Sequence, residues 1–194
     1  DQYDLIIKNG TVATAADTGL PVAFKAVSIH ILHAGSVRTI AAITDELGNY
    51  QVQWGPLRGE AGAYMVAGGH PKAGVGAAQD SFTLMGMKVS KDVLRHFLYV
   101  GDTATGQVEV INLSDVPMTN LTASAVNPAG NLAVGLSLSD TTLPGGGKVT
   151  LAYSFEATAL EPEWSDWDIV IACDEGVQAV TMASIDVLAP NSHV

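Results

Sequence analysis

Apolar and polar residues alternate one by one along several short segments of this chain. In AVSIHILHAG, Val27, Ile29 and Ile31 fall on one side of an extended strand, and Ser28 and His30 fall on the other. The segment YQVQW repeats this period of two, with its aromatic and valine side chains on one face. Apolar residues at helical spacing are almost absent, so the pattern predicts an all-β protein.

Turn-forming residues separate the predicted strands at short intervals. Runs of Val, Ile, Thr and aromatic residues recur about every 8 to 12 residues between clusters of Gly, Pro, Asn and Asp, which is typical of sandwiches of antiparallel strands. In TDELGN, Asp45 can accept backbone hydrogen bonds and Gly48 can adopt a positive φ. The second half holds about seven strands in about 100 residues, which matches the size of one immunoglobulin-like sandwich.

The chain of 194 residues is therefore predicted to form two tandem immunoglobulin-like antiparallel β-sandwiches. The first would span residues 1–88 and the second residues 89–190, with 191–194 as a tail or linker. We place the boundary at MGMKVSKD, where an apolar run gives way to charged residues. The next segment, KDVLRHFL, fits either a helical turn or an entry strand. Because the sequence starts without Met and ends in VLAPNSHV, we expect it to be a piece of a longer chain.

Composition narrows the classes of partner. With 47% hydrophobic and 15% charged residues the chain is expected to fold, and its net charge of -11 disfavours nucleic acid and anionic membranes. The single cysteine, Cys173, can form neither an internal disulfide nor a zinc site of several thiolates. Stability is therefore expected to come from packing. The sequence has no run that approaches the roughly 20 apolar residues needed to span a bilayer, so membrane insertion is not expected.

Two parts of the sequence resemble domains of known families. RTIAAITDELGNYQVQW followed by EAGAYMVAG is similar to bacterial immunoglobulin-like and macroglobulin-type domains, in which a Thr-Asp turn with Gly precedes a strand containing Tyr. GQVEVINLSDVPMTNLTASAV, LPGGGKVTLAYSFEA and EGVQAVTMASIDV resemble CARDB-like sandwiches, which occur in tandem in large bacterial surface and secreted proteins. The resemblance covers nearly the whole chain. It implies an extracellular or cell-surface location and no particular ligand.

The stretch EPEWSDWDIV combines two tryptophans with four carboxylates. Period two places Trp167 on the core face of a strand, whereas Trp164 precedes the strand and is expected to be partly exposed. An exposed Trp can stack on a sugar ring while neighbouring carboxylates accept its hydroxyl protons. The candidate ligand-binding residues are therefore Trp164, Glu161, Glu163 and Asp166.

Two tyrosines, Tyr64 and Tyr153, are candidates for a second sugar platform. For Tyr153 the alternation favours a core position instead, because it shares a strand face with Leu151 and Phe155.

The same carboxylates could alternatively bind calcium, which takes six to eight oxygen ligands at about 2.3 to 2.6 Å. Asp166 and Asp168 are the candidate calcium ligands, although their spacing matches no defined calcium loop. No other cofactor is expected. His30 and His33 would face opposite sides of a strand and could not share one metal ion, so we interpret the histidines as scattered surface residues.

Motifs for covalent catalysis are absent from the sequence. It has no G-x-S-x-G or S-x-x-K arrangement, and Cys173 lies in an apolar strand, which favours a buried, inert thiol. GVGAAQ lacks the third glycine of a dinucleotide fingerprint. We therefore expect no enzyme.

The sequence favours a non-catalytic structural or interaction segment, made of spacer or adhesin-type modules, in a larger bacterial surface or secreted protein. One alternative is a carbohydrate-binding module that uses Trp164 and the neighbouring carboxylates, and another is an accessory domain of a secreted carbohydrate-active enzyme. The expected partners are neighbouring domains of the parent chain, and under the binding alternatives a glycan or a surface protein.

Overall fold

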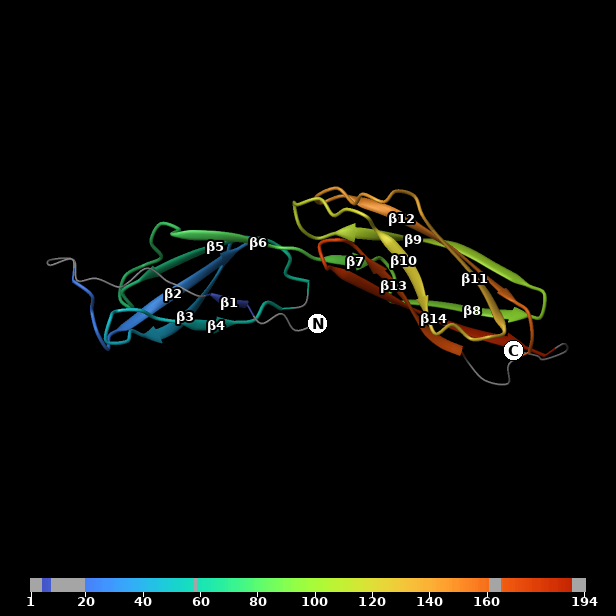
Figure 1. Ribbon diagram of the computed structural model, residues 1–194, viewed down its shortest axis with the longest axis horizontal. Helices are drawn as coiled ribbons and strands as arrows, with labels where there is room; N and C mark the ends of the chain where they lie inside the picture. Colours follow the sequence, from blue (N-terminus) through green and yellow to red (C-terminus); the bar gives the residue numbers. More distant parts are fainter. Residues whose placement is uncertain (1–4, 8–19, 58, 161–164, 190–194) are drawn as a thin grey trace. The chain divides into compact units, whose positions relative to one another are not determined.

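The computed structural model describes residues 5–7, 20–57, 59–160 and 165–189, and within these ranges it contains β-strands and no helix (Figure 1). The predicted all-β class is confirmed. The chain divides into two compact units, Asp1–Leu84 and Met85–Val194. No stretch of the described residues forms a helix long and apolar enough to cross a membrane.

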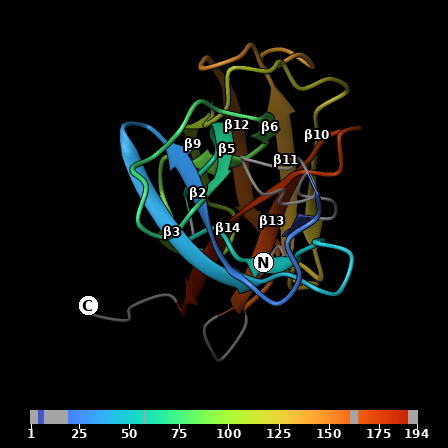
Figure 2. The same cartoon turned by 90° about the vertical axis from the view of Figure 1, so that its left-hand side faces the viewer.

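The first unit is built on one four-stranded sheet and one short strand pair. Antiparallel strands follow the order β3-β2-β5-β6, which can be traced in Figure 2, and β1 pairs with β4. Its core contains Val27, Ile29, Ile31, Val52, Trp54 and Tyr64. The strands are β1 (Leu5–Ile7), β2 (Ala26–His33), β3 (Ser36–Ile43), β4 (Val52–Trp54), β5 (Gly62–Gly69) and β6 (Asp80–Leu84).

Strand β2 is buried on both of its faces. The predicted core face of Val27, Ile29 and Ile31 is confirmed, but Ser28 and His30 on the other face are also only 7% exposed. The interpretation of the histidines as surface residues is therefore wrong for His30. His30 is buried because β2 is a central strand, with β3 on one side and β5 on the other, so that side chains of both neighbours flank its own. His30 Nδ1 lies 2.9 Å from the hydroxyl of Thr39 on β3.

The predicted turn chemistry of TDELGN is confirmed. Asp45 Oδ1 accepts the backbone N–H groups of Leu47 and Asn49, each at 2.8 Å. The side-chain hydrogen bond from Asn49, helped by these two backbone hydrogen bonds, favours the ionised carboxylate and holds the pKa of Asp45 below its ordinary value. Gly48 has φ 80, a conformation that glycine adopts without a steric penalty.

The second unit consists of two four-stranded sheets, β11-β12-β9-β7 and β10-β13-β14-β8. With β7, β9, β10, β11, β12, β13 and β14 lettered A to G, the orders become D-E-B-A and C-F-G followed by β8. This is the arrangement of a seven-stranded immunoglobulin sandwich with β8 added beside strand G. The strands are β7 (Met87–Val89), β8 (Val93–Tyr99), β9 (Thr103–Asn112), β10 (Thr122–Val126), β11 (Leu132–Leu138), β12 (Lys148–Ala157), β13 (Ser165–Ala172) and β14 (Gln178–Leu188).

The entry into the second unit has two features that the sequence pattern did not give. The predicted boundary between residues 88 and 89 falls inside β7, which pairs with β9. KDVLRHFL enters strand β8 at Val93, and β8 pairs with β14 in parallel, from Val93 opposite Met182 to Tyr99 opposite Leu188. The other strand pairs described in this unit are antiparallel, in agreement with the predicted antiparallel sandwich. The entering segment joins one sheet through β7 and the other through β8, where it runs in the same direction as the last strand.

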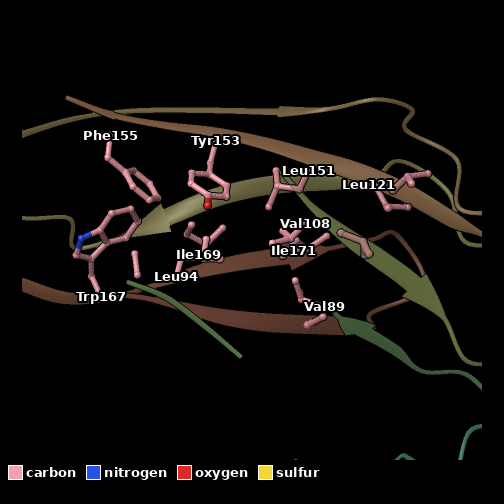
Figure 3. Packing of buried hydrophobic residues seen from close by; sticks show 14 of the residues in the cluster. Val89, Leu94, Val108, Leu121, Leu151, Tyr153, Phe155, Trp167, Ile169 and Ile171 are labelled. Atoms are coloured by element: carbon pink, nitrogen blue, oxygen red, sulfur yellow. The ribbon is translucent and has the colours of Figure 1, made fainter. Parts of the chain in front are cut away.

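The core of the second unit lies between its two sheets (Figure 3). The ring of Phe155 stacks on Tyr153 at 4.9 Å and meets Trp167 edge-on at 5.4 Å, measured between ring centroids. The predicted core face of β13 is confirmed, since Trp167, Ile169 and Ile171 are at most 5% exposed. Cys173 lies one residue beyond the end of β13 and is only half-buried.

Candidate functional site

The acidic stretch EPEWSDWDIV, residues 161–170, lies only partly within the described residues. Glu161, Glu163 and Trp164 lie outside the described residues, so the predicted sugar-binding set stays a prediction. Asp166 and Asp168 lie on β13, and both are exposed on the face opposite the core. Their cross-strand neighbours on β14 are Ser184 and Met182.

Calcium binding by Asp166 and Asp168 also stays a prediction. Across the described ranges, no group of three or more His, Cys, Asp or Glu side chains is placed to hold a metal ion. Calcium takes six to eight oxygen ligands, and two carboxylates on a flat strand face supply only a few of these.

Tyr64 and Tyr153 are both buried, which makes the prediction of sugar platforms wrong for them. Tyr64 is 1% exposed, lies between the rings of His33 and Phe82, and donates its hydroxyl to the carbonyl of Glu60 at 2.8 Å. Tyr153 is 7% exposed, and its hydroxyl lies 3.3 Å from His96 Nε2. Burial raises the pKa of both phenols, so both stay protonated and act as packing groups.

A shallow groove of about 610 Å³ lies over the sheet of β9, β12 and β11. It is hollow because small residues of three neighbouring strands meet there, with Gly135 beside Ser154 and Ser137 beside Ala152. The described lining offers hydroxyl and amide groups but no carboxylate, imidazole or thiol. It comprises Thr105, Gly106, Gln107, Gly135, Leu136, Ser137, Ala152, Tyr153 and Ser154.

Sequence reasoning missed this groove. Each small residue is ordinary in its own strand, and only the register between three strands brings them together. The groove can provide neutral hydrogen bonds to an extended ligand, and none of its described groups is suited to acid–base or nucleophilic chemistry.

Cys173 has the environment of a structural thiol. Its Sγ–H donates to the carbonyl of Val177 at 3.4 Å, and partial burial raises its pKa. A raised pKa lowers the fraction of nucleophilic thiolate at neutral pH. This environment agrees with the expected inert cysteine, although the residue is less buried than predicted.

A carboxylate that the sequence analysis overlooked fastens one end of the second sandwich. Glu175, in the turn between β13 and β14, accepts the N–H of Thr119 at 3.0 Å and its hydroxyl at 2.8 Å. These hydrogen bonds favour the ionised form and lower the pKa of Glu175 to about 2. In the same turn, Asp174 accepts the side-chain N–H of Asn120 at 2.5 Å. The two acids therefore hold the segment before β10 in place.

Comparison with known proteins gives distant structural likenesses only. No protein-family model and no curated protein matches the sequence. A family 123 glycoside hydrolase from Clostridium perfringens is similar over 55% of this chain, which spans 28% of the hydrolase chain, at 10% identity and a TM-score of 0.43. The PapD-like domain 7 of human CEP192 is similar over 62% of this chain and 100% of its own, at 12% identity and a TM-score of 0.42.

The secreted serine protease VesC from Vibrio cholerae is similar over 92% of this chain and 49% of its own, at 12% identity and a TM-score of 0.41. At such TM-scores these likenesses carry no argument about family or activity. The assignment of the sandwich fold depends on the strand order of the chain itself.

Proposed function

We propose that this chain is a non-catalytic structural segment, acting as spacer modules in a larger bacterial surface or secreted protein. Its first half would belong with bacterial immunoglobulin-like or macroglobulin-type domains and its second half with CARDB-like domains. Its partners would be the neighbouring domains of the parent chain, outside the cell. The segment would hold another domain at a distance and transmit tension along the chain.

The observation that carries this proposal is the parallel pairing of β8 with β14. Strand β8 is the second strand of the unit, directly after the short β7, and β14 is its last strand; the two pair over seven residues. A further hydrogen bond, from the N–H of Met182 to the carbonyl of Asp92 at 2.9 Å, extends the ladder. Tension applied at the two ends first loads the three-residue pair of β7 with β9, and once β7 detaches it pulls β8 and β14 past each other. The hydrogen bonds are then loaded together in shear, which is how a module resists extension.

A buried polar network supports the same role by joining loops at one end of the sandwich. Asn112, at the end of β9 and 2% exposed, donates its amide to the carbonyls of Val116 at 2.8 Å and Pro144 at 3.1 Å. Its Oδ1 accepts the N–H of Ser114 at 2.9 Å and the hydroxyl of Ser114 at 2.8 Å. A satisfied buried network of this kind rigidifies the loops that it joins.

A binding panel separates a spacer from a carbohydrate-binding module. The full chain, Trp164→Ala and Ser137→Gln would each be tested against soluble and insoluble polysaccharides, with and without calcium. Trp164→Ala removes the predicted platform, and Ser137→Gln fills the groove from an exposed position. A spacer is expected to show no retention by any glycan in any form.

Retention by one glycan that disappears in either variant, with its circular dichroism spectrum unchanged, would replace the spacer by a glycan-binding module. The affected variant would also assign the site, because Trp164→Ala reports on the acidic stretch and Ser137→Gln reports on the groove.

A further inference from the structure

Strand β11 has a free edge in the second unit. It is the terminal strand of the sheet β11-β12-β9-β7, and its partner strand is β12. Terminal strands present unpaired N–H and C=O groups and can pair with another chain. The spacer function neither requires nor excludes such pairing.

Two hydrogen bonds fix which backbone groups of β11 are free. The N–H of Ser139 donates to Thr150 and the N–H of Thr158 donates to Asn131, each at 2.8 Å, at the two ends of the β11–β12 ladder. Bonded and non-bonded positions alternate along an antiparallel pair, so Ala133, Gly135 and Ser137 face β12. The backbone groups of Val134, Leu136 and Leu138 therefore point to the open side, where none of the described residues bonds to them.

The side chains of β11 suit pairing with an identical strand. Leu132–Leu138 contains neither a charged residue nor proline. This matters because a net charge of -11 makes most surfaces of two copies repel each other. Other terminal strands carry charge, namely Arg38 on β3, Asp80 on β6, Lys88 on β7 and Arg95 on β8. The other uncharged terminal strands are shorter, since β10 has five residues and β1 and β4 have three each, against seven in β11.

We propose that two copies of this chain associate through β11, with the two strands antiparallel about a two-fold axis at Leu136. In this register Leu136 lies opposite its own copy, and Val134 lies opposite Leu138 of the second copy. All three pairs join positions whose N–H and C=O groups are free, so each pair can exchange two hydrogen bonds. The interface is isologous, and it makes one continuous sheet from the two β11-β12-β9-β7 sheets.

The side chains on either face of β11 fit this arrangement. Val134, Leu136 and Leu138 pack against the core but remain partly exposed, so the second copy would cover their exposed side. On the outer face, Gly135 and Ser137 are too small to obstruct an approaching strand. One strand pair buries less than the roughly 1,200 Å² of a stable standard interface. The dimer is therefore weak and should form at high protein concentration.

Hydrogen exchange measured by NMR on the full chain tests the register directly. The amides of Val134, Leu136 and Leu138 should exchange freely in dilute protein and become protected as concentration rises, in parallel with a shift to dimer mass in sedimentation. The amides of Gly135 and Ser137 provide an internal control, because they bond to β12 and should be protected at every concentration.

Two substitutions at one position separate backbone pairing from side-chain packing. Leu136→Pro removes an N–H that the fold does not use, and proline is tolerated at such positions of edge strands. This variant should lose the dimer. Leu136→Ala removes more of the side chain than Leu136→Pro does, but it keeps the backbone N–H, so it should still dimerise.

If Leu136→Pro fails to fold, Ser137→Glu serves instead, because its two copies flank the two-fold axis. This variant should dimerise less than the wild type, and added salt should partly restore the dimer by screening the repulsion. A wild-type chain that stays monomeric at the highest concentration would overturn the proposal, even if an unrelated extended peptide bound to β11. A folded Leu136→Pro variant that still forms the dimer would also overturn it.

Discussion

Individual residues fix the turns of the first unit through backbone conformation. The hairpin between β2 and β3 turns at Ala34 and Gly35, which have φ 47 and φ 80. Two-residue hairpins with positive φ at both positions favour Asn followed by Gly, because an L residue with a Cβ is strained there. Gly35 meets this requirement, and Ala34 adopts the same backbone region at a cost.

Ala34→Asn should therefore stabilise the first unit, by about 1 kcal/mol, because Asn tolerates the left-handed region better than Ala. The measurement is urea unfolding followed by the amide signals of β2 and β3. The matched control is Ala41→Asn at an exposed position of β3, where extended backbone disfavours Asn and no gain is expected. A gain in both variants, or in neither, would contradict the assigned turn.

Glu175 makes a second prediction at this scale, about acid stability. Its pKa is about 2 in the folded chain, below its ordinary value of 4.5. A carboxyl whose pKa falls on folding stabilises the folded state above its unfolded pKa, and this contribution is lost as pH falls through the folded value. Thermal stability of the second unit should thus decrease between pH 4.5 and pH 2.

Glu175→Gln should flatten this part of the pH profile, because the amide does not titrate. Asp140→Asn, an exposed acid that makes a local turn hydrogen bond, is the matched control. Equal slopes in wild type and Glu175→Gln would show that the Thr119 contacts do not hold the carboxylate ionised.

At the scale of strands, alternation predicted the faces that pack and failed for features set by neighbouring strands. The period of two in β13 places Trp167, Ile169 and Ile171 in the core as predicted, because that strand has one buried face. The same rule misplaced His30, because the burial of a central strand depends on its partners. The groove escaped prediction for a related reason, since it needs the register of three strands.

Cross-strand register can require glycine at a particular position, as the pair of Gly106 on β9 and Tyr153 on β12 shows. These residues lie directly opposite each other, and the Tyr153 ring covers the place where a Cβ of Gly106 would be. Gly106→Ala should destabilise the second unit by about 1 to 3 kcal/mol, the usual cost of overpacking.

The control for this prediction is the double mutant with Tyr153→Ala, which removes the ring. Denaturant unfolding of the four forms should show that Gly106→Ala costs much less in the Tyr153→Ala background. An equal cost in both backgrounds would mean that the ring does not set the requirement for glycine.

At the scale of the whole second unit, the parallel pairing of β8 with β14 joins its second strand to its last. A sequence pattern gives the faces of a strand but not the direction of its partner, so this pairing could not be predicted. The pairing has a mechanical consequence. Force directed along the two strands must break all the hydrogen bonds between them at once. Force directed across a hairpin breaks its hydrogen bonds one at a time.

Single-molecule unfolding with two pulling geometries tests this claim most directly. In a Cys173→Ala background, handles at Lys91→Cys and Ala189→Cys load β8 and β14 in shear, because these positions lie just before β8 and just after β14. Handles at Ser165→Cys and Ala189→Cys share one attachment point and instead open the β13–β14 hairpin from its free end. At equal loading rate, the shear geometry should need a several-fold higher force. Equal forces in the two geometries would contradict the load-bearing role of the β8–β14 pair.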